Sequence, residues 1–116
     1  FWQATLSASD ANRALLRWAR AVTRKNVIVV FDGCYHGMVE DCFVELRHGR
    51  TRPDAGLVGQ VFDMTRTTRA VSWNDLGALE AALAQGDVAA VLCEPAMTNC
   101  GMILPEENFH KRLRAM

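Results

Sequence analysis

Two short apolar runs constrain the fold of this chain more than any other feature. Residues 27–31 read Val-Ile-Val-Val-Phe and end at Asp32-Gly33, and residues 88–93 read Val-Ala-Ala-Val-Leu-Cys and end at Glu94-Pro95. Runs of this length fit strands, and strands that are apolar on both faces are typical of parallel sheets covered on both sides. The two runs therefore predict an α/β fold with a mainly parallel sheet and flanking helices.

A helical pattern precedes the first run. Its apolar residues recur at helical spacing and form one stripe: Ala11, Ala14, Leu15, Trp18, Ala19 and Val22. Ser9 is the expected N-cap, and Asp10 then lies in the first turn, where a negative charge suits the positive end of the helix dipole. A helix followed by a buried strand is the repeating unit of a doubly wound sheet.

Two more helices are expected further along the chain. The second is predicted to begin at Asn74, as its N-cap, and to end at Gly86. The third is predicted to begin at Pro105, with Glu106 and Glu107 in its first turn and basic residues in its last turn.

The periodic pattern of apolar residues that predicts helices and strands is weakest over residues 40–69. Residues 47–59 hold three glycines and a proline among charged residues, which predicts a surface excursion with little regular structure. Residues 70–73 are predicted to form a short strand.

Length and charge limit the organisation and the partners of the chain. With 116 residues, half of them hydrophobic, the chain can bury the core of one domain. It opens on Phe1-Trp2 and stops at Met116 inside a helical pattern, so residues 1–116 are expected to be a partial domain truncated at both ends. Thirteen basic residues balance thirteen acidic ones, which favours neither nucleic acid nor an anionic membrane. No apolar run is long enough to span a bilayer, so a cytoplasmic protein with a small-molecule partner is expected.

The four cysteines are irregularly spaced and are expected to be free, mostly buried thiols. A zinc site could be assembled on paper from Cys34, His36, His48 and Cys100, but no Cys-x-x-Cys or His-x-x-x-His pair anchors it. No metal is expected.

Three segments carry residues suited to a phosphorylated aromatic ligand. Ser7-Ala8-Ser9 offers hydroxyls and free backbone N–H groups at a helix start, which suits a phosphate but equally an ordinary N-cap. Tyr35 follows the first buried strand and could stack on a planar ring or be a packed surface aromatic. His36 could bond to a substrate, brace the turn through a backbone carbonyl or stay neutral beneath a ring, and bracing is the commonest of these. Glu94 either positions a ligand or accepts backbone N–H bonds at the strand end.

The order of these segments resembles the class III (subgroup II) aminotransferases. That family carries Ser-Gly-Thr-Glu-Ala-Asn, Phe-x-Gly-x-Tyr-His-Gly and Glu-Pro, where this chain has Ser-Ala-Ser-Asp-Ala-Asn from Ser7, Phe-Asp-Gly-Cys-Tyr-His-Gly from Phe31, and Glu94-Pro95. The resemblance covers residues 6–113. It implies part of the large domain of a fold-type I transferase that uses pyridoxal 5'-phosphate.

The resemblance also implies roles for individual residues. The cofactor-binding residues would be Ser7, Ala8 and Ser9 at the phosphate, Tyr35 on the ring and Glu94 beside it. His36 and Asn99 would lie on the substrate side or behind the cofactor. Asn99 is similar to the aminomutase branch, because the branch acting on ornithine and 4-aminobutyrate has a glutamate there. Ala8 and Asp10 depart from the family's glycine and glutamate, which favours transamination over an internal amino shift.

The implied activity is amino transfer between a small-molecule amino donor and a carbonyl acceptor, in a homodimer. The family's cofactor-binding lysine and the aspartate that pairs with the ring nitrogen have no counterpart in residues 1–116, since Lys25 and Lys111 lie at a helix-to-strand junction and on an amphipathic helix. No catalytic residue is expected in this piece, and alone it should be inactive.

Three other classes of protein share some of these features. A dinucleotide-binding domain would need Gly-x-Gly-x-x-Gly between strand and helix, and the chain has none. A thiol hydrolase pairing Cys34 with His36 would lack an oxyanion cradle. An α/β module that binds a phosphate ligand other than pyridoxal phosphate stays open.

Overall fold

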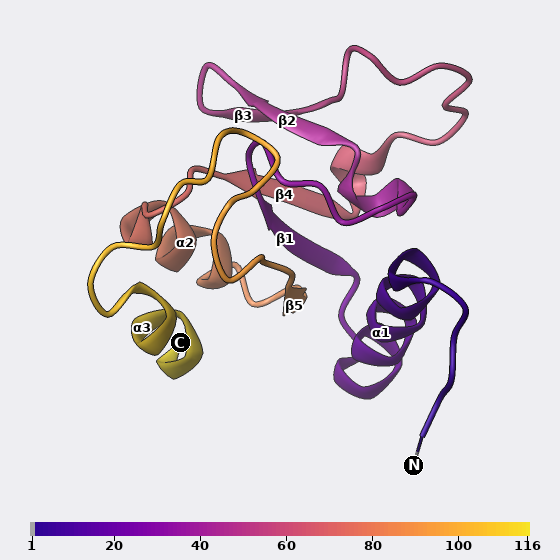
Figure 1. Ribbon diagram of the computed structural model, residues 1–116, viewed down its shortest axis with the longest axis horizontal. Coiled ribbons are helices and arrows are strands. Elements are labelled where there is room, and N and C mark those ends of the chain that lie inside the picture. Colours follow the sequence, from indigo (N-terminus) through magenta and orange to yellow (C-terminus); the bar gives the residue numbers. More distant parts are fainter. Residues whose placement is uncertain (1) are drawn as a thin grey trace.

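The computed structural model describes residues 2–116 as a central parallel sheet with helices on both faces (Figure 1). The sheet has the strand order β4-β1-β5, with β1 (Val27–Phe31) in the middle, β4 (Thr68–Val71) on one side and β5 (Val88–Val91) on the other. Both pairings are parallel. The α/β fold class and the parallel sheet predicted from the apolar runs are confirmed.

The two faces of β1 pack against different helices. Ile28 and Val30 lie in a buried cluster with Leu16, the one buried residue of α1 (Ala8–Thr23). Their neighbours Val29 and Phe31 lie in a second cluster with residues of α2 (Leu76–Leu83) and α3 (Phe109–Ala115). Figure 1 shows α1 apart from α2 and α3, with the sheet between them. Because all five residues of β1 are buried, the strand is apolar throughout, as its sequence shows.

The apolar stripe predicted for α1 does not face the sheet. Leu15, Trp18 and Val22 are exposed, and Leu16, which lies outside the stripe, makes the buried contact. The helix itself is confirmed. Helical spacing identifies an apolar face but does not identify the surface that covers it.

Residues 47–59 are more regular than the sequence indicated. β2 (Val44–Arg47) and β3 (Arg50–Pro53) form an antiparallel hairpin, so the prediction of little regular structure is wrong for its first half. His48 and Gly49 both have positive φ, which is the backbone of a two-residue hairpin turn. Short 3₁₀ turns, η1 (Glu40–Cys42) and η2 (Met64–Arg66), flank this region.

The predicted starts of the second and third helices are wrong, and one residue explains both. Asp75, rather than Asn74, caps α2, and α3 begins at Phe109 rather than at Pro105. The Asn74 side chain is engaged elsewhere: its Nδ2 donates to the Leu104 carbonyl at 3.2 Å and its Oδ1 accepts from the Glu106 N–H at 2.9 Å. The segment after Leu104 is thereby held against Asn74, and the helix starts only beyond it.

Both predicted outer strands differ from the observed ones at their ends. β4 covers residues 68–71 instead of 70–73, and β5 stops at Val91 instead of Cys93.

The four cysteines are free: Cys42 is buried, Cys34 and Cys93 are half-buried and Cys100 is exposed. Each helix in the described part of the chain is too short or too polar to cross a membrane.

Candidate functional site

The predicted site residues gather at one edge of the sheet. The carboxyl ends of β1 and β5 lie side by side because the two strands are parallel neighbours. Residues 33–38, here called the Tyr35 segment, follow β1, and residues 94–99 follow β5. The first turn of α1 joins them, since Ser9 contacts the Tyr35 segment. Open α/β proteins bind their ligands at this edge.

The first turn of α1 is arranged differently from the prediction. Ser7, and not Ser9, is the N-cap: its backbone is extended, and its Oγ accepts a hydrogen bond from the Asp10 N–H at 3.1 Å. Ser7 Oγ also donates to the Asp10 carboxylate at 2.8 Å. Asp10 lies in the first turn, as expected. The cap leaves the N–H groups of Ala8 and Ser9 at the positive end of a sixteen-residue helix, where a phosphate can bind.

Ser9 is freed from capping and faces the Tyr35 segment. Its Oγ accepts a hydrogen bond from the Met38 N–H at 3.0 Å. Gly37 lies directly against it: a Cβ on Gly37 would stand 2.1 Å from Ser9 Oγ, and the Gly37 φ of 84° is in the left-handed region. A glycine is therefore required where the segment crosses the start of α1.

Tyr35 and His36 point to opposite environments. The Tyr35 side chain is 56% exposed at the sheet edge, whereas His36 is only 8% exposed. Asn12, which was not among the candidate residues, donates from Nδ2 to the His36 carbonyl at 2.9 Å. Because it joins residues 24 positions apart, no local pattern in the sequence indicated this contact.

Glu94 lies beside His36 and is held by the turn that follows it. Its Oε2 accepts from the Thr98 N–H at 3.0 Å and from the Thr98 hydroxyl. Burial is the largest single influence on the pKa of Glu94 and raises it, whereas the hydrogen bonds from Thr98 lower it. The backbone N–H of Tyr35 and, when it is protonated, His36 also lower it, and together these effects outweigh burial, so the pKa is below the ordinary glutamate value and the side chain is ionised at neutral pH.

His36 is buried as a neutral ring. Burial lowers its pKa, and the Glu94 charge and the Leu92 carbonyl oppose this only in part. Within residues 2–116, His36 Nε2 and Glu94 Oε1 are both buried without a hydrogen-bond partner. Buried polar atoms usually have a hydrogen-bond partner, so these two are available to a ligand or a water molecule at this edge; a third such atom, Gln60 Nε2, lies outside both segments.

Asn99 joins the two segments from the other side. Its Nδ2 donates to the Gly33 carbonyl at 3.2 Å, and a Cβ on Gly33 would stand 3.3 Å from Cys100. A pocket of about 460 Å³ opens beside Tyr35 and Asn99, and its other wall includes Glu45 of β2. The hairpin that forms this wall is anchored by Asp32, whose carboxylate accepts from the Leu46 N–H at 2.7 Å. The sequence did not predict this wall, because residues 47–59 were expected to be irregular.

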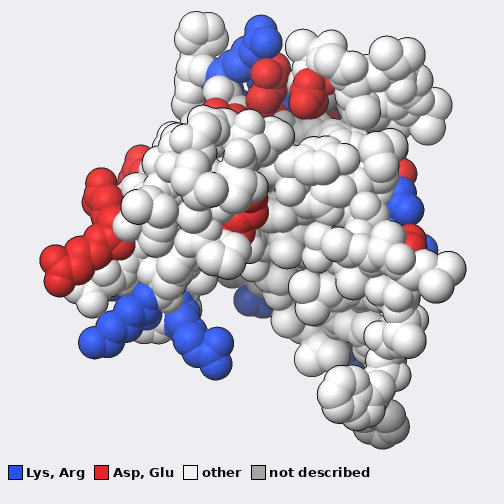
Figure 2. Space-filling model, in the orientation of Figure 1, with Lys and Arg blue, Asp and Glu red and all other residues white. Residues whose placement is uncertain are grey.

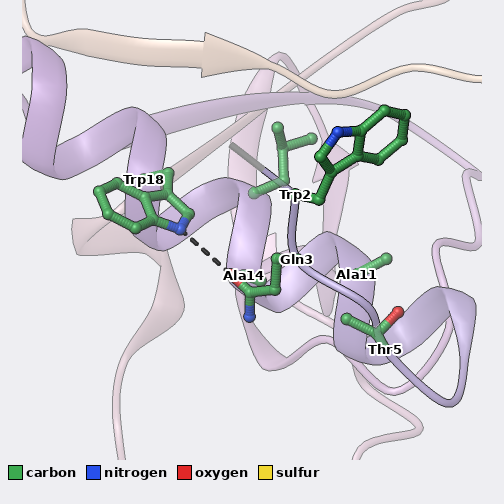
Figure 3. A pocket seen from close by; sticks show the side chains of 7 residues that line it. Trp2, Gln3, Thr5, Ala11, Ala14 and Trp18 are labelled. Atoms are coloured by element: carbon green, nitrogen blue, oxygen red, sulfur yellow. Dashed lines mark hydrogen bonds between the residues drawn. The ribbon is translucent and has the colours of Figure 1, made fainter.

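A larger pocket of about 680 Å³ lies elsewhere, beside the exposed face of α1 (Figure 3). Trp2, Leu15 and Trp18 line it, and the Trp18 indole donates to the Gln3 side chain at 3.2 Å. No titratable side chain lines this pocket. The smaller pocket beside Tyr35 is the better candidate, because polar groups from three parts of the chain converge around it.

The residues present fit a ligand that combines a phosphate with a flat ring. The first turn of α1 supplies N–H groups and the Ser9 hydroxyl, and the exposed Tyr35 ring supplies an apolar face. The Ala8 methyl, on an exposed residue, stands where the family motif has a glycine. Figure 2 shows acidic and basic side chains in small groups scattered over the visible face rather than in one field of a single sign. A small ligand bound by local groups suits this surface better than a polyanion.

Comparison with known proteins gives one family. The family model described as Aminotransferase class-III matches residues 4–116. Glutamate-1-semialdehyde 2,1-aminomutase of Sorangium cellulosum is 39% identical over 108 residues, which are 89% of this chain and 24% of that protein. The enzyme of the same name from Ignicoccus hospitalis is 39% identical over 114 residues, or 93% of this chain and 26% of that protein. The chain thus spans about a quarter of the length of the curated relatives it matches.

Solved structures agree with the sequence comparison. The crystal structure of a glutamate-1-semialdehyde-aminomutase from Pseudomonas aeruginosa PAO1 matches with a TM-score of 0.94 and 52% identity, over 99% of this chain and 26% of that chain. A variant of that enzyme has been solved in complex with PMP. An omega-transaminase from Sphaerobacter thermophilus matches with a TM-score of 0.84 and 28% identity, over 96% of this chain and 27% of that chain.

Proposed function

Because this chain belongs to the class III aminotransferases, we propose that its residues form the phosphate- and ring-binding part of a pyridoxal-phosphate-dependent enzyme. The enzyme transfers an amino group between a small-molecule amino donor and a carbonyl acceptor. The observation that carries the proposal is the convergence of the first turn of α1, the Tyr35 segment and Glu94 at one sheet edge.

The phosphate would lie at the first turn of α1. Ser9 and the N–H groups beside it would bind it, with Ser7 keeping the helix start in place through its cap to Asp10. Compared with a glycine, Ala8 would leave the phosphate less room to approach the backbone. The phosphate would therefore lie closer to the Ser9 hydroxyl. Ser9 therefore has two roles, since the same oxygen already orders Met38.

The ring would lie on Tyr35. When bound, pyridoxal 5'-phosphate supplies the carbonyl that exchanges for an amino group and a ring that delocalises negative charge. Tyr35 would hold the ring in one plane. Ionised Glu94, held by Thr98, would lie beside neutral His36, which is buried behind the segment and would brace it beside Leu92, the residue after β5.

The covalent anchor of the cofactor would come from other residues of the full-length enzyme. Lys25 follows α1 at the end opposite to Ser9, and Lys111 lies on α3. Neither is at the edge where the phosphate site lies. Residues 1–116 thus form a partial domain that holds part of the site, and the homodimer and cytoplasmic location implied by the family resemblance stay predictions.

A stacking role for Tyr35 is tested by removing its ring. Tyr35→Ala in the full-length enzyme is expected to weaken pyridoxal phosphate binding by about fivefold or more, because aromatic stacking contributes about 1 kcal/mol beyond buried area. Equilibrium titration of the apoenzyme, followed by absorbance, gives the dissociation constant. Tyr35→Phe keeps the ring and should bind as the unsubstituted enzyme does. Equal affinities in all three proteins would remove Tyr35 from the site.

A second candidate function is the internal amino shift of glutamate 1-semialdehyde. It is favoured by Asn99, which is similar to the aminomutase branch, and by the names of the relatives, although Ala8 and Asp10 favour ordinary transamination. Asn99 lines the pocket beside Tyr35, where a substrate side chain would lie.

Substrate assays separate the two functions. With Asn99 in place of a glutamate, the full-length enzyme is expected to turn over ornithine and 4-aminobutyrate slowly compared with α-amino acids or glutamate 1-semialdehyde. Isomerisation of glutamate 1-semialdehyde without an added acceptor would select the aminomutase. Rapid turnover of ornithine would contradict the assignment of the branch.

A further inference from the structure

The Tyr35 segment depends on side chains from outside itself for its shape. It forms neither helix nor strand, so its backbone N–H and carbonyl groups have no ladder to join and need other partners. Two hydrogen bonds are local, from Cys34 N to the Phe31 carbonyl and from Val39 N to the Gly37 carbonyl. Others come from three side chains of α1 and of residues 94–99: Ser9, Asn12 and Asn99.

The exposed ring of Tyr35 is oriented mainly by these backbone contacts. A side chain that is 56% exposed gains little orientation from packing. The backbone that follows it is fixed instead. Asn12 donates to the carbonyl of the next residue, His36, and Ser9 accepts from the N–H of Met38 two residues further on.

Asn12 is well placed to transmit the rigidity of α1. It lies three residues after Ser9, so both side chains project from one face of the helix toward the same segment. Asn12 is half-buried, and its Nδ2 to His36 O distance of 2.9 Å is that of a well-formed hydrogen bond. The His36 ring is buried, so packing holds the Cα on one side of this peptide group and the Asn12 hydrogen bond holds its carbonyl.

We propose that Asn12 is a positioning residue that sets the orientation of Tyr35 over the cofactor, a role that rests on the function proposed above. Asn12 acts through the His36 carbonyl and does not contact the ring of Tyr35. Its loss leaves the ring present but free to leave the stacking plane. Its contribution to cofactor binding therefore exists only when Tyr35 is present.

This dependence is tested with a double-mutant cycle in the full-length enzyme. Asn12→Asp removes the donor and places a carboxylate against the His36 carbonyl, and Asn12→Ala removes the side chain. Each is expected to weaken pyridoxal phosphate binding about fivefold to tenfold. In a Tyr35→Ala background the same changes are expected to alter the dissociation constant less than twofold, because interacting residues are not additive.

Two further measurements accompany the affinities. The visible circular dichroism of the bound cofactor should change in Asn12→Asp as it does in Tyr35→Ala, because both alter the ring's surroundings. Asn26→Asp, the same substitution at an exposed position just after α1, is the matched control and should change neither affinity nor spectrum. Urea unfolding of each apoenzyme reports any general loss of stability.

The outcomes are distinct. Equal weakening by Asn12→Asp in both backgrounds would overturn the positioning role, and so would failure of both Asn12 variants to fold, which would assign the residue to the fold alone. Absence of saturable pyridoxal phosphate binding in the unsubstituted enzyme would overturn the proposed function itself. Saturable binding that depends on Tyr35 but not on Asn12 would leave the proposed function in place and remove only the inference.

Discussion

Gly37→Ala in the full-length enzyme is expected to reduce the affinity for pyridoxal phosphate by a factor of ten or more. The new Cβ would stand 2.1 Å from Ser9 Oγ and 3.1 Å from Ser9 Cβ, so rotating the hydroxyl alone does not make room. The Gly37 φ of 84° adds about 1–2 kcal/mol of backbone strain. The Met38 to Ser9 hydrogen bond, worth about 1 kcal/mol, is lost as the segment moves away from α1.

Gly49 provides a matched control for this substitution. It has a φ of 71° but nothing within 4 Å of an added Cβ, so Gly49→Ala carries backbone strain without a clash. Titration of both apoenzymes should show nearly unchanged cofactor affinity for Gly49→Ala. The two variants binding equally well would mean that the contact between Ser9 and Gly37 does not shape the phosphate site.

Phe31→Ala is expected to destabilise the full-length apoenzyme by about 3–5 kcal/mol, because it leaves a cavity at a fully buried aromatic position. The Phe31 ring packs edge-on against Trp73 at a centroid distance of 5.0 Å and against Phe109 at 5.6 Å. These contacts join β1 to the segment before α2 and to α3. The loss of stability should therefore affect several elements. Urea unfolding followed by circular dichroism measures the change.

Phe62→Ala is the comparison for this variant. Phe62 is 47% exposed, and its removal should cost less than about 1 kcal/mol. A destabilisation by Phe31→Ala no larger than that of Phe62→Ala would show that the sheet face carrying α2 and α3 does not depend on the aromatic cluster.

The sequence was sufficient to predict the strands that have an unbroken apolar run. Residues of β1 and β5 are apolar in an unbroken run, which is typical of strands in a parallel sheet; β1 is buried throughout and β5 is half-buried. The start of α1 was predicted two residues late, because Ser7 and Ser9 are equally good caps in isolation. What distinguishes them is the Met38 N–H, which takes the Ser9 hydroxyl away from the helix.

The misplaced elements share a physical cause. Asn74 has the composition of an N-cap but binds the segment around Leu104 instead, which moves the start of α2 by one residue and delays α3. The hairpin β2–β3 was missed because glycine and charge indicate a loop, although His48-Gly49 also suits a tight turn. In each case a contact between distant residues decided among conformations that are locally equivalent.

The sequence indicated side chains that lie together at the sheet edge, but not the side chains that hold them in place. Tyr35, His36 and Glu94 follow strands, and strand ends at the carboxyl edge are where ligands bind. Asn12 ends the Ser-Ala-Ser-Asp-Ala-Asn motif, but the sequence assigned no role to it or to Thr98. Their importance depends on which backbone groups they reach, and that is a property of the folded chain.

The four thiols described above differ in their chemical accessibility. Burial raises the pKa of both Cys34 and Cys42 to about 12, and since the thiolate is the reactive form, alkylating reagents should modify them slowly at neutral pH. Cys100 is exposed, and its sulfur lies 3.3 Å from where a Gly33 Cβ would stand, at the base of the Tyr35 segment. A fluorophore attached to Cys100 would therefore report on ligand binding from a position beside the pocket, while the buried thiols of the core remain unlabelled.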